Sequence, residues 1–138
     1  MVQLIIGEKG KGKTKVLLDK VNEEVLNANG NYVYLDKSSK HMYELNNKVR
    51  LIDVSNFYIE NPDQFVGFIS GIISQDHDLE KMYFDNFLSI SNCGDDFEDL
   101  LAKIEKISNN YKVDFVISMS KVEKDFSDAW KNCIIVSL

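Results

Sequence analysis

GEKGKGKT, residues 7–14, is the stretch on which the fold prediction depends. It follows the apolar run VQLII at residues 2–6 and precedes a segment whose apolar residues recur every three to four positions. The first pattern predicts a buried strand, and the second a helix over about residues 14–28. Glycines allow backbone conformations that other residues avoid. A strand, a basic glycine loop and a helix in this order predict a loop that binds phosphate at a helix N-terminus.

The spacing of the stretch, G-x-x-x-x-G-K-T, matches the Walker A pattern at every fixed position. In this pattern backbone N–H groups surround the phosphates, Lys13 reaches the terminal phosphates and the Thr14 hydroxyl binds Mg²⁺. A flexible basic turn is the alternative interpretation, and the flanking strand and helix argue against it. The residues expected to contact the nucleotide are Gly7, Glu8, Lys9, Gly10, Lys11, Gly12, Lys13 and Thr14. For Lys9 and Lys11 the alternative is that their side chains are simply solvated.

Besides the basic glycine stretch, an acidic residue is expected at the end of another strand. The segment KMYFD, residues 81–85, predicts a strand that ends at Asp85. A carboxylate at this place can hold Mg²⁺ together with Thr14. The alternative is an aspartate that merely ends a strand, since aspartate is common in turns.

On these residues the chain resembles the P-loop NTPases, and the resemblance covers most of its length. It implies binding of ATP and Mg²⁺ and a class in which an extra strand lies between the Walker A and Walker B strands. A glutamate that polarises the attacking water commonly follows the Walker B aspartate in that class, but Asn86 stands here. Asparagine can orient a water and cannot accept its proton. The expected catalytic residues are Lys13, which contacts the phosphates, and Asn86, which can orient the water. Asp36, Asp53 and Glu60 remain alternatives for the residue that accepts the proton.

Other members of the superfamily share less with this chain. The twitching-motility ATPases share the Walker A motif but are far longer and carry a further domain. Thymidine kinases continue into a zinc-bearing lid, for which two cysteines are too few. No Asn-Lys-x-Asp segment of the kind that selects guanine is found at a strand end, so ATP is expected rather than GTP. At the next strand end, Ser118 or Ser120 is a candidate sensor of the terminal phosphate.

The rest of the chain alternates between short apolar runs and helical periods, which predicts βαβ units. We expect an α/β fold, namely a three-layer α/β/α sandwich with a mostly parallel sheet of five or six strands, as in P-loop NTPases. Asp95 and Glu98 have the spacing of a capping box for one of the helices. The further strands are expected at residues 32–35, 49–54, 81–84, 113–119 and 133–138, and the further helices at 38–46, 62–73, 95–110 and 121–131.

Size and charge limit the function classes. The 138 residues suit a single nucleotide-binding domain spanning 1–138. The net charge of -6 argues against a nucleic-acid-binding surface. No apolar run approaches the ~20 residues of a membrane helix, so no membrane span and a cytoplasmic location are expected. His41 stands alone in the sequence and is expected to be exposed, and Asp76-His77-Asp78 is expected to be a turn rather than a metal site.

Three functions remain open at this point. The first is a slow hydrolase of ATP whose bound nucleotide drives a change of shape. The second is a nucleotide-dependent switch that acts through a protein partner which the sequence does not identify. The third is a phosphotransferase acting on a small molecule or nucleoside, for which 138 residues leave little room for a lid.

Overall fold

The computed structural model describes all 138 residues. It contains one six-stranded sheet in the order β3-β2-β4-β5-β1-β6, and every neighbouring pair of strands is parallel. The predicted α/β class and parallel sheet are thereby confirmed. The strands are β1 (Val2–Ile6), β2 (Asn31–Asp36), β3 (Val49–Asp53), β4 (Leu79–Phe84), β5 (Asp114–Met119) and β6 (Ile134–Ser137).

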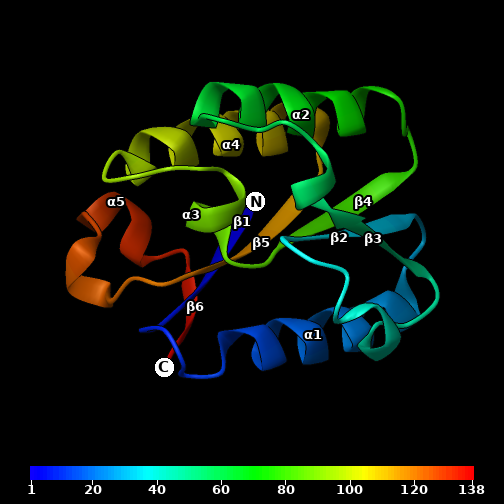
Figure 1. Cartoon of the computed structure of the whole chain (residues 1–138), viewed down its shortest axis with the longest axis horizontal. Helices are drawn as coiled ribbons and strands as arrows, with labels where there is room; N and C mark the ends of the chain where they lie inside the picture. Colours follow the sequence, from blue (N-terminus) through cyan, green and yellow to red (C-terminus); the bar gives the residue numbers. More distant parts are fainter.

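Helices cover both faces of this sheet (Figure 1). Helix α1 lies on one face, and α2 and α4 lie side by side on the other. No helix is long and apolar enough to cross a membrane. The α-helices are α1 (Lys13–Glu24), α2 (Pro62–Ser74), α3 (Phe87–Ile90), α4 (Phe97–Tyr111) and α5 (Asp128–Lys131), and short 3₁₀ turns cover Val25–Asn27, Met42–Glu44, Val54–Asn56 and Glu123–Asp125.

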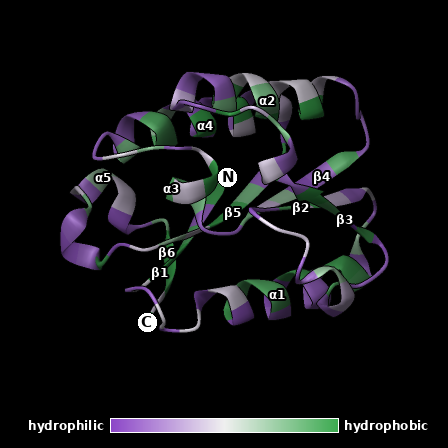
Figure 2. Ribbon diagram, in the orientation of Figure 1, coloured by the Kyte–Doolittle hydropathy of each residue, from purple (hydrophilic) through white to green (hydrophobic).

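Two apolar cores hold the three layers together, one on each face of the sheet. Alternate residues of each strand point to opposite faces, so Val33 packs toward α2 and α4 while Tyr34 packs toward α1. Apolar residues accordingly gather on the strands and on the inner sides of the helices (Figure 2). The larger core, beneath α2 and α4, includes the rings of Phe65, Phe84 and Phe87, which make edge contacts with one another, and the ring of Phe115, which makes one with Phe84.

Several local predictions differ from the structure. The helix expected at residues 121–131 is divided into the 3₁₀ turn Glu123–Asp125 and the short helix α5. The helix expected at residues 38–46 is only the 3₁₀ turn Met42–Glu44, because the segment lacks an apolar stripe to bury. The capping box at Asp95 does not form, since α4 begins after Asp96 and the Glu98 carboxylate accepts hydrogen bonds from Ser127 instead. Helix α3 was not predicted, because its four residues are too few to show a helical period.

The strand order determines where polar residues meet. Strand β5 lies between β1 and β4, so one strand separates the glycine stretch from Asp85. Strand β2 pairs with β4, with Leu35 opposite Phe84. Because all strands are parallel, the residues that follow β1, β2 and β4 lie along one edge of the sheet, where ligands commonly bind in open α/β folds.

Candidate functional site

The glycine stretch forms an open loop that ends at the first turn of α1. Gly12 precedes the helix in a left-handed conformation with φ of 94°, and Gly10 is also left-handed with φ of 86°. The backbone N–H groups of Gly10, Gly12, Lys13 and Thr14 donate to no acceptor within the protein. A helix N-terminus with free N–H groups attracts anions. The loop therefore fits a phosphate group.

A polar cavity of about 200 Å³ lies against this loop. No apolar residue lines it, which suits phosphate oxygens and a hydrated cation better than a base. Five residues of the glycine stretch reach the cavity, together with the ends of β4 and β5. Its lining residues are Lys9, Gly10, Gly12, Lys13, Thr14, Asp85, Asn86, Ser118 and Ser120.

Three residues of the stretch lie outside the cavity and support the loop instead. Gly7 leaves no room for a side chain, because a Cβ there would approach Leu138 to 3.0 Å. The backbone carbonyl of Glu8 accepts hydrogen bonds from the N–H of Lys11 at 3.3 Å and from Nζ of Lys13 at 3.0 Å. The side chain of Lys11 is exposed to solvent. Of the eight residues predicted to contact the nucleotide, five therefore line the cavity.

Lys13 is buried in the loop, with 9% of its surface exposed. Burial lowers the pKa of its amino group, and the charge of Asp85 partly opposes that shift. The bond from Nζ to the Glu8 carbonyl holds the amino group across the loop. A phosphate group beside Lys13 would restore a negative partner to this partly desolvated cation.

Asp85 is 4% exposed and is held by three hydroxyl groups. Its Oδ1 accepts hydrogen bonds from Thr14 at 3.0 Å and Ser118 at 3.2 Å, and its Oδ2 accepts one from Tyr34 at 2.9 Å. The predicted pair of metal-binding residues, Thr14 and Asp85, is thus in direct contact. Hydroxyl and carboxylate oxygens are the ligands that Mg²⁺ prefers, so this pair fits that ion.

Tyr34 is a site residue that the sequence reasoning missed. Burial and the Asp85 carboxylate raise the pKa of its phenol, so Tyr34 remains a hydrogen-bond donor. The alternation of side chains along a strand could have placed Tyr34 on one sheet face with Asp36, but it does not show that Asp85 lies beside them. Tyr34 shares its sheet face with Asp36, two residues later, and with Asp85, two residues after Tyr83.

Asn86 and the two serines sit at the far side of the cavity. Asn86 has a left-handed backbone, with φ of 56°, and its N–H donates to the Ser118 hydroxyl at 2.8 Å. Ser118 is buried, and its hydroxyl accepts this bond and donates one to Asp85. Ser120 is exposed and lines the cavity, so it is the better placed of the two serines to meet a ligand.

Of the three alternative proton acceptors, only Asp36 lies near Asp85. Asp53 accepts bonds from the N–H and hydroxyl of Ser55, and Glu60 is exposed at the approach to α2. Asp36 is buried, and burial and the neighbouring Asp85 raise the pKa of its carboxyl. Asp36 does not line the polar cavity beside the glycine stretch.

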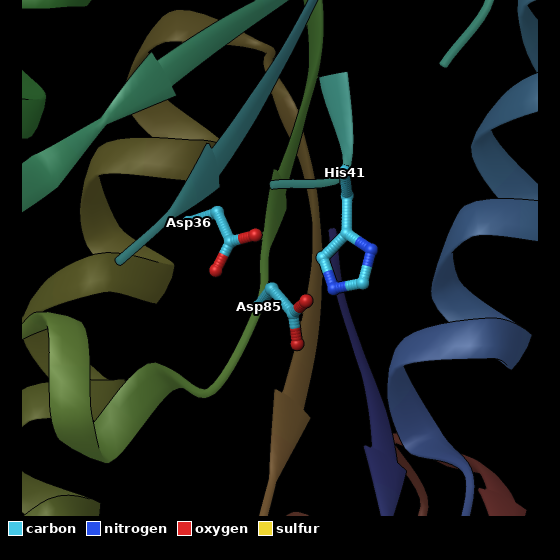
Figure 3. Close-up of side chains that lie close together, drawn as sticks. All are labelled: Asp36, His41 and Asp85. Carbon is cyan, nitrogen blue, oxygen red and sulfur yellow. The ribbon is translucent and has the colours of Figure 1, made fainter. Parts of the chain in front are cut away.

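His41 is neither alone nor fully exposed, contrary to the sequence prediction. Its side chain is 22% exposed and lies within reach of Asp36 and Asp85 (Figure 3). Asp36 and Glu44 are close to His41 in the sequence, but Asp85 is distant, so no local motif shows that the three ligating groups meet. In the segment Asp76-His77-Asp78, the Asp76 carboxylate accepts hydrogen bonds from the Asn31 side chain and pairs with Arg50.

No protein-family model matches this chain, and no curated protein is significantly similar to it in sequence.

Proposed function

We propose that the protein binds a magnesium-bound nucleoside triphosphate, ATP in the first place, at the loop of residues 7–14. The observation that carries this proposal is the direct contact of Thr14 with Asp85 beside a loop of free N–H groups. The Walker A spacing and the strand order, with β5 between β1 and β4, support it. A structural turn would need neither the buried carboxylate nor the buried lysine.

Each residue has a distinct role in this proposal. The N–H groups of Gly10, Gly12, Lys13 and Thr14 bind phosphate oxygens, and Lys13 adds a positive charge. Thr14 and Asp85 hold Mg²⁺, while Tyr34 and Ser118 orient the Asp85 carboxylate. The ion, when bound, neutralises charge on the phosphate oxygens.

Slow turnover follows from the groups that line the cavity. Asn86 cannot accept a proton, and Asp36 lies outside the lining. The one carboxylate in the cavity, Asp85, is engaged by three donors. We therefore propose a nucleotide-dependent switch that acts through a protein partner, with hydrolysis as a slow side reaction.

Nucleotide binding and phosphate release measured on the same samples test this proposal. Calorimetry with ATP and ADP, with and without Mg²⁺, should give magnesium-dependent binding. Phosphate release should stay far below ~1 s⁻¹, the low end of typical enzyme turnover. Release at or above that rate would mean that a proton acceptor does reach the site, and the switch would be replaced by an ATPase.

A further inference from the structure

A cluster of potential metal ligands shares Asp85 with the polar cavity beside the glycine stretch. One ligating atom from each of Asp36, His41 and Asp85 falls within 4.8 Å of the other two. The three residues come from the end of β2, the segment after it and the residue that follows β4 (Figure 3). Nucleotide binding as proposed above uses Asp85 and leaves Asp36 and His41 without a role.

Asp36 is the member of this cluster whose hydrogen bonding is incomplete. It is 7% exposed, and its Oδ1 accepts a hydrogen bond from the N–H of Lys37 at 2.7 Å. Its Oδ2 is buried and has no hydrogen-bond partner. A buried carboxylate oxygen without a donor is costly, and a second carboxylate, Asp85, lies beside it. A cation between the two carboxylates would give the Asp36 Oδ2 a partner and offset the repulsion between the two charges.

No lysine forms an ion pair with either carboxylate of the cluster. The amino group of Lys37 donates to the carbonyl and hydroxyl of Ser89, and that of Lys13 donates to the Glu8 carbonyl. Lys40 acts on Asp36, and Lys13 on Asp85, through charge alone.

His41 is held as a metal-binding histidine usually is. Its Nδ1 contacts the Glu44 carboxylate, and its other ring nitrogen faces Asp85 (Figure 3). In metal sites the ring nitrogen that does not bind the ion typically donates to a carboxylate, which orients the imidazole. A separate cavity of about 330 Å³ between α1 and this segment includes Thr14, His41 and Glu44 in its lining, so His41 is the member of the cluster that reaches it.

We propose that Asp36, His41 and Asp85 bind a divalent first-row transition cation in the absence of nucleotide. Imidazole together with carboxylates favours Mn²⁺ or Zn²⁺ over Mg²⁺ and Ca²⁺, which take oxygen ligands. With metal–ligand bonds of about 2.0–2.2 Å, two ligand atoms lie at most about 4.4 Å apart, and the ligating atoms of these three residues all lie within 4.8 Å of one another. His41 belongs to the segment between β2 and β3, whereas Asp36 ends β2. The proposal shares Asp85 with the nucleotide site and does not depend on nucleotide binding.

Binding of Mn²⁺ to the protein without nucleotide tests this inference. The loss of the six-line spectrum of free Mn²⁺ gives the affinity, and electron spin echo modulation reports whether a nitrogen is bound. Wild type should bind one Mn²⁺ with a nitrogen signal, and excess Mg²⁺ should displace it poorly. Because no nucleotide is present, failure of ATP binding would leave this result unaffected.

Two substitutions and a matched control complete the test. His41→Ala should remove the nitrogen signal and weaken binding at least as much as Glu44→Ala, which should cost roughly 10-fold. His77→Ala, at the only other histidine and exposed, should change neither. Circular dichroism confirms that each variant is folded. Absence of Mn²⁺ binding in wild type, or a nitrogen signal that survives in folded His41→Ala, would overturn the proposal.

Discussion

The Thr14 hydroxyl donates a 3.0 Å hydrogen bond to the Asp85 carboxylate, across 71 positions of sequence. This bond joins the first turn of α1 to the residue that follows β4, and in the sheet β5 lies between β4 and β1, the strand that precedes the glycine stretch. A magnesium ion held by both residues would take the place of the shared proton. The same contact thus stabilises the free protein and marks the proposed ion site.

Thr14→Val should abolish the dependence of ATP affinity on Mg²⁺. Valine keeps the shape of threonine but lacks the oxygen that binds the ion. Calorimetry should then give the same weak affinity with and without Mg²⁺, whereas Thr14→Ser should retain the magnesium effect. Equal magnesium dependence in Thr14→Val and wild type would remove Thr14 from the ion site.

Asp36→Asn should stabilise the free protein at neutral pH. The folded-state pKa of Asp36 is raised, so its ionised form is disfavoured in the folded protein. The stability that the protonated carboxyl supplies is present at low pH and is lost as the pH rises through the folded-state pKa. Asparagine cannot ionise and can donate toward Asp85, so the gain should be roughly 1–3 kcal/mol at pH 7.

That gain should shrink as the pH falls toward the ordinary aspartate value of 3.8, where wild type is protonated as well. Urea unfolding at a series of pH values measures it. Asp128→Asn, at a side chain that is 99% exposed, is the control and should change stability little at any pH. A gain from Asp36→Asn that is independent of pH would show that ionisation is not its cause.

Tyr34→Phe should destabilise the protein by roughly 1–3 kcal/mol, because it leaves a buried, charged Asp85 oxygen without its donor. Tyr43→Phe is the matched control, since Tyr43 is 91% exposed. Urea unfolding should therefore separate the two variants clearly. If both change stability equally little, the Tyr34 hydroxyl does not support Asp85.

Gly12→Ala and Gly71→Ala should have opposite effects on stability. Gly12 is left-handed, so alanine there should cost about 1–2 kcal/mol. Gly71 lies within α2 with open space around it, so alanine there should add about 0.5–1 kcal/mol. Thermal unfolding of both variants provides the comparison. A stabilising effect of Gly12→Ala would contradict a left-handed backbone at residue 12.

The elements that the sequence predicts well are those with strong local patterns. The apolar run of β1, the helical period of α1 and the end of β4 before Asp85 are visible without the structure. The glycine spacing likewise places Lys13 and Thr14 at the start of a helix. These features depend on neighbours in the chain.

The residues that sequence reasoning missed depend on pairing between strands. Tyr34 meets Asp85 only because β2 lies next to β4, and His41, in the segment after β2, meets Asp85, the residue after β4, because of the same pairing. Strand order is not encoded in hydrophobic periodicity. Side-chain alternation along β2 could have placed Tyr34 and Asp36 on one face, but not beside a particular strand.

The most direct test of nucleotide binding is the affinity for ATP with Mg²⁺ of wild type and Lys13→Ala, measured by calorimetry. Removing a charged donor to phosphate costs roughly 1.5–3 kcal/mol, or about 10- to 150-fold in affinity. Lys106→Ala, at an exposed position on α4, is the matched control and should bind as wild type does. Binding by wild type that is lost selectively in Lys13→Ala is the predicted result. No binding by wild type, or equal binding by both variants, would contradict the proposed site.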